Sequence, residues 1–346
     1  MGRLRVTVFA AVGLLVLVSA ALAIWLRSEL ERTYYGANSS EVFLEIPRHA
    51  NTTQVANLLV NSGVLRYRLP FILYLRCTDL GRRIKAGEYR FAEPATPEQI
   101  AQRLVRGDIT FRSITVPEGL TAHETIELLA KNGFGDPEEM EHLLLRTDWI
   151  RDFDPKARNL EGYLFPETYR FGRKVDPETV IKTMIHQFRL RMAKMTALYP
   201  VPAGSSLRNV VILASMIEKE VKKPEEGPMV ASVLMNRLKR GVPLSCDATI
   251  IYALKLAESY QGRLGKADLV MESPYNSYIH TGLPPGPISN PGEISIRAAL
   301  TPAHTDYLYY VSRNDGTHQF SRDLASHQNA VNRFQKSAAR LIPRKK

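Results

Sequence analysis

The feature that most constrains the fold is the stretch from Asn209 to Ile217, which is almost wholly apolar and leads directly into Glu218-Lys219-Glu220. Ser215 is its one polar break, and no proline or glycine interrupts it. A helix that is apolar on every side belongs in the centre of a domain. We therefore predict a buried helix over residues 209–223, because Pro224 cannot continue it and disfavours a helical residue before it.

Glu218 is the candidate catalytic residue, since it lies near the C-terminal end of this predicted helix. A buried carboxyl group at the negative end of a helix dipole holds its proton more readily than one in water, and this suits a general acid. Glu220 lies roughly 200° further round the helix, too far to share one pocket with Glu218. The alternative is structural: both glutamates pair with neighbouring lysines, because ion-pair networks resemble catalytic clusters.

The N-terminal stretch from Val6 to Leu26 carries no charge and matches the ~20 residues that span a bilayer. Arg3 and Arg5 precede it, which predicts an N-terminus inside and the body of the protein outside. Ala21-Leu22-Ala23 resembles a signal-peptide cleavage site and leaves that alternative open. The apolar stretch is longer than the usual signal-peptide core, so we expect an uncleaved, single-pass anchor in the cell (inner) membrane.

The composition predicts an anionic partner and no bound metal. Lysine and arginine total 46 against 35 aspartates and glutamates, a formal net charge of +11. Membrane surface, acidic polymer and nucleic acid would all fit, but the basic residues form no long run and the export signal argues against nucleic acid. Cys77 and Cys246 are the only cysteines, and we interpret them as separate, mostly buried thiols. No His, Cys, Asp and Glu cluster has metal-ligand spacing, so we expect no metal or cofactor.

Three predicted strand-helix units follow a polar linker over residues 27–41. The strands are Phe43–Pro47, Gly87–Phe91 and Arg112–Pro117, and the helix caps are Thr52 or Thr53, Thr96 and Thr121. These units contain no titratable cluster, which favours a binding or positioning role.

The sequence from residue 151 onwards differs in character. We predict helices over 177–197, 209–223, 229–240 and 324–341, and a hairpin between residues 307 and 320. The loop over residues 273–292 is rich in proline and glycine, and we expect it to be rigid. Its tyrosines and asparagines suit stacking on sugar rings and bonding to hydroxyls, while a structural lid without a ligand is the alternative.

Several motifs in order make the chain resemble the endolytic murein transglycosylase family, which is also called YceG-like. The motifs are Glu161-Gly162-Tyr163-Leu164-Phe165-Pro166-Glu167-Thr168-Tyr169, Ala214-Ser215-Met216-Ile217-Glu218-Lys219-Glu220, Asn236-Arg237-Leu238, Ser273-Pro274-Tyr275-Asn276, Gly282-Leu283-Pro284-Pro285-Gly286-Pro287-Ile288, Asn290-Pro291-Gly292 and Ser295-Ile296-Arg297-Ala298-Ala299-Leu300. Each is modest alone, but their order and spacing are specific. One departure is that Ser245 and Ala248 stand where the family usually has glutamine and proline.

The resemblance implies an α+β protein with five parts. They are a cytoplasmic stub (1–5), a transmembrane helix (6–26), a linker (27–41), a LysM-like strand-helix subdomain (42–112), and a mixed α+β catalytic domain around the buried helix (113–346). It also implies a lytic transglycosylase that cuts nascent peptidoglycan strands between N-acetylmuramic acid and N-acetylglucosamine. The product would end in 1,6-anhydro-N-acetylmuramic acid and terminate strand elongation.

The family's single catalytic glutamate falls on Glu218. By resemblance and residue chemistry, the candidates for binding substrate are Asp247, Thr249, Tyr275, Asn276 and Glu220, the last as support for the helix end. Whether Glu161 and Tyr169 touch sugar or pack stays open. The expected partners are peptidoglycan strands, cell-wall synthases (penicillin-binding proteins) and the membrane. The alternative function is a non-catalytic, membrane-anchored peptidoglycan-binding protein.

Overall fold

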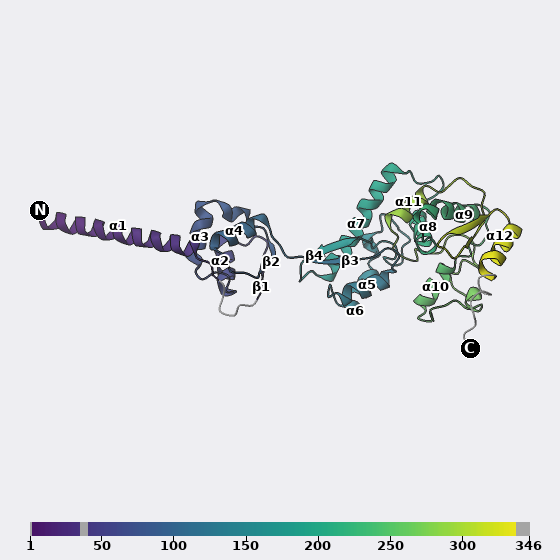
Figure 1. The fold of residues 1–346 in the computed structure, drawn as a ribbon, viewed down its shortest axis with the longest axis horizontal. Helices are drawn as coiled ribbons and strands as arrows, with labels where there is room; N and C mark the ends of the chain where they lie inside the picture. Colours follow the sequence, from purple (N-terminus) through teal and green to yellow (C-terminus); the bar gives the residue numbers. More distant parts are fainter. Residues whose placement is uncertain (1, 35–40, 337–346) are drawn as a thin grey trace. The chain divides into compact units, whose positions relative to one another are not determined.

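The computed structural model describes residues 2–34 and 41–336, and the chain divides into two compact units. Unit 1 comprises residues 1–112 and 170–173, and unit 2 comprises residues 113–169 and 174–346. Figure 1 labels most of their helices and strands. Residues 35–40 of the predicted linker lie outside the described residues, and residues 27–31 belong to the first helix.

Helix α1 (Gly2–Glu31) contains the predicted membrane span. Its segment Val12–Glu31 is long and apolar enough to cross a membrane and is not buried anywhere inside the protein. Trp25, near the end of the apolar stretch, packs against Tyr67 with ring centroids 5.7 Å apart. A signal sequence near the N-terminus can also meet this criterion of length and composition, so retention of this helix stays a prediction.

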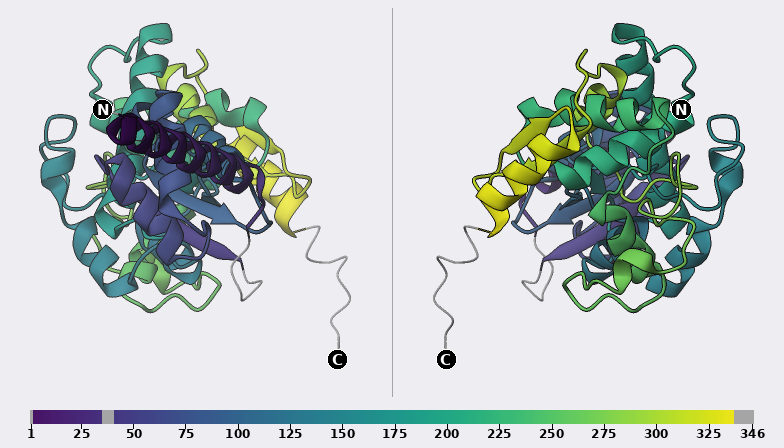
Figure 2. Two further views of the ribbon diagram at one scale, coloured as in Figure 1. Left: turned by 90° about the vertical axis from the view of Figure 1, so that its left-hand side faces the viewer. Right: turned by 90° about the vertical axis from the view of Figure 1, so that its right-hand side faces the viewer.

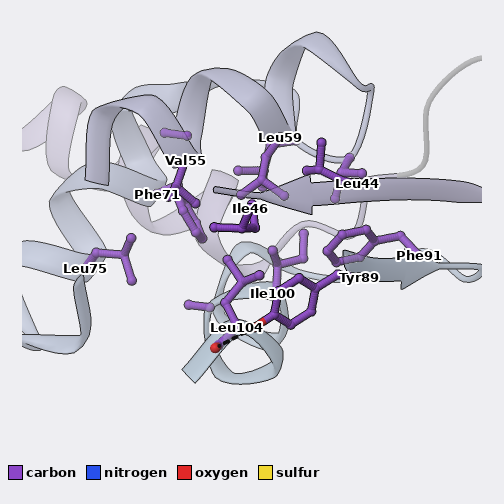
Figure 3. Packing of buried hydrophobic residues seen from close by; sticks show 14 of the residues in the cluster. Leu44, Ile46, Val55, Leu59, Phe71, Leu75, Tyr89, Phe91, Ile100 and Leu104 are labelled. Carbon is purple, nitrogen blue, oxygen red and sulfur yellow. Dashed lines mark hydrogen bonds between the residues drawn. The ribbon is translucent and has the colours of Figure 1, made fainter. Parts of the chain in front are cut away.

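The rest of unit 1 packs three helices and two strands around one apolar core. The elements are β1 (Val42–Ile46), α2 (Thr52–Asn61), α3 (Arg68–Cys77), a 3₁₀ turn (Leu80–Arg83), β2 (Gly87–Phe91) and α4 (Pro97–Arg106). Strands β1 and β2 are antiparallel, and Leu44 lies opposite Tyr89. Both side chains face the core with Leu59 and Phe71 (Figure 3). The Tyr89 hydroxyl donates to the carbonyl of Leu104 at 3.1 Å, so its polar end is satisfied inside the core.

Local sequence predicted these strands and the starts of most helices, with two corrections. The cap of α2 is Asn51, which accepts a hydrogen bond from the Gln54 N–H at 2.9 Å. The predicted caps Thr52 and Thr53 are therefore already inside the first turn. Helix α3 was not predicted, and the third predicted strand, β3 (Arg112–Thr115), pairs with β4 (Thr168–Phe171).

Unit 2 is mainly helical. Its α-helices are α5 (Ala122–Lys131), α6 (Pro137–Leu144), α7 (Pro177–Leu198), α8 (Leu207–Glu220), α9 (Gly227–Lys239), α10 (Asp247–Leu256), α11 (Glu293–Leu300) and α12 (Leu324–Val331). Short 3₁₀ turns cover Thr147–Trp149, Pro224–Glu226 and Asp268–Val270, and a π-turn covers Asn332–Lys336. Thr121 caps α5 in a capping box with Glu124, as predicted.

Helix α8 is the predicted apolar helix, and every residue from Val210 to Ile217 is buried. Helices α9 and α11 pack against it (Figure 1). The helix ends at Glu220, three residues before the predicted end, where the Val221 N–H bonds to the carbonyl of Ile217. Ser215, the polar break in the run, donates to the Ile212 carbonyl at 2.7 Å.

The proline- and glycine-rich loop that precedes α11 is fixed to α8 by Ser215. Its hydroxyl oxygen accepts from the Ile288 N–H at 3.0 Å, and its carbonyl accepts from the Ser289 hydroxyl at 3.1 Å. These two hydrogen bonds hold the loop against a buried polar group of the core helix, and its rigidity stays a prediction.

Asn290, in the same loop, joins three segments that are distant in sequence. Its side-chain oxygen accepts from the N–H groups of Gly162 and Leu164 at 3.0 and 3.1 Å, and its amide nitrogen donates to the Thr125 hydroxyl at 3.3 Å. Its backbone N–H donates to Leu120 at 2.8 Å. Only 1% of Asn290 is exposed, so these contacts form without competition from water.

The C-terminal part of unit 2 is the predicted hairpin followed by a helix. Strands β5 (Tyr309–Ser312) and β6 (His318–Ser321) are antiparallel, and α12 lies beside them (Figure 2). The helix predicted to end at residue 341 ends as α-helix at Val331, and residues 337–341 lie outside the described residues. Both cysteines are free; Cys246 is buried, but Cys77 is exposed, contrary to the predicted burial.

We expect Asn290→Ala to destabilise unit 2 by about 2 to 4 kcal/mol, because it leaves buried N–H groups of Gly162 and Leu164 without an acceptor. Thermal or urea unfolding measures the change. The matched control is Asn329→Ala on the exposed face of α12, which should shift stability by no more than about 0.5 kcal/mol. Equal stability of both variants would contradict the role given to Asn290.

Candidate active site

Glu218 lies where the end of α8 meets the start of α11. Its carboxylate oxygen Oε2 accepts a hydrogen bond from the Gly292 N–H at 3.0 Å, and Gly292 is the N-cap residue of α11. Glu218 as a residue is half-buried, in contrast to the fully buried residues before it in α8. The carboxylate thus faces the negative end of one helix dipole and the positive end of another.

The chain that enters α5 forms the second wall of this site. The Gly119 N–H donates to the Asn290 carbonyl at 2.9 Å, and the Gly119 carbonyl accepts from Lys219 Nζ at 2.9 Å. Gly119 has φ +78°, and a β-carbon there would lie 3.4 Å from Cγ of Glu218. A glycine therefore suits both the backbone turn and the space beside the catalytic candidate.

Glu118 brings a second carboxyl group to the same place. A β-carbon built on Gly292 would lie 1.9 Å from Oε1 of Glu118, so the Glu118 carboxyl rests directly on that glycine. Partial burial raises the pKa of Glu118, and the charges of Glu218 and Glu293 raise it further. Glu118 and Glu218 therefore both lie against Gly292.

Lys219 connects this site to a further acidic group, Glu124. Burial opposes ionisation of Glu124, yet the pKa of Glu124 is lowered. The carboxylate accepts hydrogen bonds from Lys255 and from the Thr121 N–H, and the positive charges of Lys255 and Lys219 stabilise it further. The Lys255 ammonium contacts the Glu124 carboxylate directly. Glu124 is therefore a charged partner of two lysines, whereas Glu118 and Glu218 lie close to each other.

Glu161 lies at a cavity of about 680 Å³ between α5, α6 and α10. Only 3% of the residue is exposed, and burial raises its pKa to about 8 although the Ala122 N–H donates to it at 2.9 Å. The Tyr252 hydroxyl is a further partner. The carboxyl group thus binds the start of α5 to α10, while Tyr169 is buried and donates to the Phe165 carbonyl at 2.6 Å.

Glu220 belongs to a different surface from Glu218. It lines a cavity of about 340 Å³ together with Asp247 and Tyr278. Burial raises the pKa of Glu220, against the hydrogen bonds that it accepts from Cys246 and Tyr310. The Cys246 sulfur lies 3.0 Å from Glu220, and Asp247 accepts from the Tyr278 hydroxyl at 2.5 Å.

The other three predicted substrate contacts are largely internal. Thr249 is fully buried and bonds to the Cys246 carbonyl at 2.7 Å. Asn276 is also fully buried and donates to the Met271 carbonyl at 2.8 Å. Tyr275 is half-buried against Tyr252, with ring centroids 4.9 Å apart. Of the three, Thr249 is connected to Glu220 through Cys246, whereas Tyr275 lies beside Tyr252 and Glu161. The contact of all three with substrate stays a prediction.

Two residues of the site were not predicted from sequence: Glu118 and Gly292. Glu118 stands in Pro117-Glu118-Gly119 between a predicted strand and a predicted helix cap, where a carboxylate looks like an ordinary loop residue. The signal that was available is the glycine after each of Glu118 and Pro291, since glycine often marks a close approach of the backbone. Among the residues that the structure describes, no group of three or more His, Cys, Asp or Glu side chains is placed to hold a metal ion.

Comparisons with known proteins agree on one family. A family model described as YceG-like matches residues 44–333. An endolytic murein transglycosylase of Bacillus subtilis (strain 168) is 30% identical over 323 residues, which are 86% of each chain. One from Streptococcus pneumoniae (strain ATCC BAA-255 / R6) is 28% identical over 80% of this chain and 55% of the relative. The crystal structure of a YceG-like protein from Listeria monocytogenes covers 84% of this chain and 99% of its own, with 28% identity and a TM-score of 0.56.

Glu161 should make stability depend on pH. Its pKa is raised from 4.5 to about 8 in the fold, so the stability it contributes is complete below about pH 4.5 and is lost as pH rises through about 8. We expect unfolding measured across this range to show a loss of roughly a few kcal/mol that Glu161→Gln largely removes. The control is Glu139→Gln, at an exposed position of α6, which should keep the wild-type pH dependence. A Glu161→Gln variant that also keeps the wild-type pH dependence would contradict the role given to the buried carboxyl group.

Proposed function

This chain belongs to the YceG-like family, and on that premise we propose that it is an endolytic lytic transglycosylase of peptidoglycan. It would cut nascent glycan strands between N-acetylmuramic acid and N-acetylglucosamine and so end their elongation. The names of its relatives support the enzyme class and the substrate.

The observation that carries the proposal is the position of Glu218. It is a half-buried carboxyl at the end of a buried helix, and a single backbone N–H, that of Gly292, fixes one of its oxygens at 3.0 Å. That arrangement orients the carboxyl, and a half-buried position suits a proton donor to a bound polymer. Lys219, the adjacent cation, is engaged by the Gly119 carbonyl.

In the proposed reaction, the Glu218 carboxyl donates its proton to the glycosidic oxygen while the bond from that oxygen to carbon 1 of N-acetylmuramic acid breaks. The carbon 6 hydroxyl of the same sugar then forms the new bond to carbon 1. The Glu218 carboxylate takes the hydroxyl proton and returns to its starting state. No water is consumed, and the products are a 1,6-anhydro end and a free carbon 4 hydroxyl on N-acetylglucosamine.

The internal nucleophile explains why a second carboxylate need not activate water. Glycoside hydrolases use a pair of carboxyl groups, one as acid and the other as base or nucleophile. A hydroxyl tethered in the reacting sugar replaces that second function through proximity.

The remaining parts are proposed to hold the enzyme near its substrate. Helix α1 would anchor it in the cell membrane as a single pass, with the N-terminus in the cytoplasm and the body outside. Residues 42–112 would form a LysM-like module that binds glycan; they fold as β1, α2, α3, a 3₁₀ turn, β2 and α4. Residues 113–346 would be the catalytic domain, with Asp247, Thr249, Tyr275, Asn276 and Glu220 shaping the glycan groove. Cell-wall synthases are the expected protein partners.

We expect Glu218→Gln to abolish most product formation, by ~10²–10⁴-fold, because the amide has the shape of the acid but no transferable proton. Glu220→Gln is the matched control: its carboxyl lies with Cys246 and Tyr310, so activity should fall less. The measurement is the release of anhydro-muropeptides from purified peptidoglycan, beside the melting temperatures of both variants.

The products also separate the alternatives. Binding without any cleavage would show a non-catalytic peptidoglycan-binding protein, and reducing N-acetylmuramic acid ends would show hydrolysis by water. A Glu218→Gln variant that keeps near-normal turnover, or loses it only by unfolding, would make the glutamate structural.

The proposed topology is tested by a reporter fused after Lys346. It should be active only outside the cytoplasm, and the mature protein should retain its N-terminus, because Arg3 and Arg5 flank the apolar stretch on the inner side. A mature chain that begins shortly after Ala23 would show that the helix is a cleaved signal peptide.

A further inference from the structure

We propose that Glu118 is a positioning residue for Glu218, and that the two side chains act as a carboxyl pair that shares one proton beside Gly292. This inference deepens the proposed function and rests on it. It adds a second acidic group to a site in which one glutamate was expected.

The first support is the way that the backbone fixes Glu118. Gly119 and Leu120 exchange hydrogen bonds with Asn290, through the Gly119 N–H at 2.9 Å and the Leu120 carbonyl at 2.8 Å. Lys219 Nζ holds the Gly119 carbonyl from the other side at 2.9 Å. Residue 118 therefore enters the site from a segment that is tied to both α8 and the loop before α11.

The second support is the space around Gly292. Its N–H points to Glu218, and the position that a β-carbon would occupy lies 1.9 Å from Oε1 of Glu118. A side chain at position 292 and the present position of the Glu118 carboxyl exclude each other. One glycine thus lets two carboxyl groups approach the same backbone unit.

The third support comes from the charged groups that the neighbouring helices place around Glu118. Helix α8 presents Glu218 and also Lys219, whose ammonium is held by the Gly119 carbonyl. Helix α11 presents Glu293, which lies 3.3 Å from Arg191 of α7, and Arg191 also pairs with Glu167 at 2.7 Å. Burial contributes most to raising the pKa of Glu118, and the charges of Glu218 and Glu293 add to it. Glu118 therefore holds its proton more firmly than an ordinary carboxyl group does, and we infer that this proton serves the acid step beside Gly292.

The test is the pH profile of kcat/KM for anhydro-product formation, using the full-length protein in detergent and purified glycan strands. Glu118→Gln removes a negative charge from the pair, so the pair loses its proton more readily. We expect the alkaline limb of the profile to move down by about one pH unit, and Glu118→Asp to restore part of that shift. Glu293→Gln is the matched control and should move the limb less, because Arg191 balances its charge.

Gly292→Ala is an independent variant. Its backbone φ of −80° accepts alanine, and the new methyl group takes the space of the Glu118 carboxyl. We expect the chain to fold and the alkaline limb to shift in the same direction as in Glu118→Gln. An unchanged profile in both variants would overturn the carboxyl pair while leaving the proposed function intact.

A second readout does not need activity. The raised pKa of Glu118 means that its contribution to stability is present at low pH and is lost as pH rises through the folded value. The melting temperature of Glu118→Gln relative to wild type should therefore increase as the pH rises above the ordinary carboxyl pKa of 4.5. If wild type forms no anhydro product, the proposed function fails, and a melting difference that is constant with pH would overturn the pair itself.

Discussion

The candidate site depends on one buried amide, that of Asn290. An amide that is 1% exposed must find partners inside the protein, and it finds them in Gly162, Leu164 and Thr125. Its backbone pairs with residues 119 and 120 at the same time. Losing the side chain would leave several buried groups unpaired together, and the backbone of Asn290 holds the segment before α5 against the loop before α11. Glu118, Glu218 and Gly292 meet as a consequence.

The second constraint is the meeting of two helix ends of opposite polarity. Helix α8 is apolar along its buried residues, which fixes its position in the core, and its last turn carries Glu218 to the surface of that core. Helix α11 begins at the same point and offers the Gly292 N–H. The end of a helix always has unpaired backbone groups, and here one of them is used to orient a carboxylate. The orientation comes from secondary structure, so it does not need a dedicated side chain.

Local signals allowed much of the fold to be predicted, and the gaps have a physical cause. The capping boxes at Thr96 and Thr121 and the apolar run of α8 depend on neighbouring residues, so sequence was sufficient for them. Glu218 was found because it ends that run. Glu118 was missed because it meets Glu218 only through the pairing of residues 119–120 with Asn290, which no local pattern encodes. Thr249 and Asn276 suited sugar binding by residue type, but polar side chains in a rigid loop also satisfy backbone groups, and here they are buried doing so.

A carboxyl pair and an internal nucleophile fit together for a reason of proton balance. In hydrolysis the second carboxyl must be ionised in order to activate water or attack the sugar. When the nucleophile is a hydroxyl of the substrate, the proton that leaves Glu218 returns to it from that hydroxyl within one turnover. The second carboxyl group, Glu118, then need not act as a nucleophile or base. Its charge instead determines how firmly the carboxyl pair holds the proton used for catalysis. Glu118 is placed for this role, since its carboxyl group lies against Gly292, the residue whose N–H binds Glu218. The negative charge of a third acid, Glu293, also raises the pKa of Glu118.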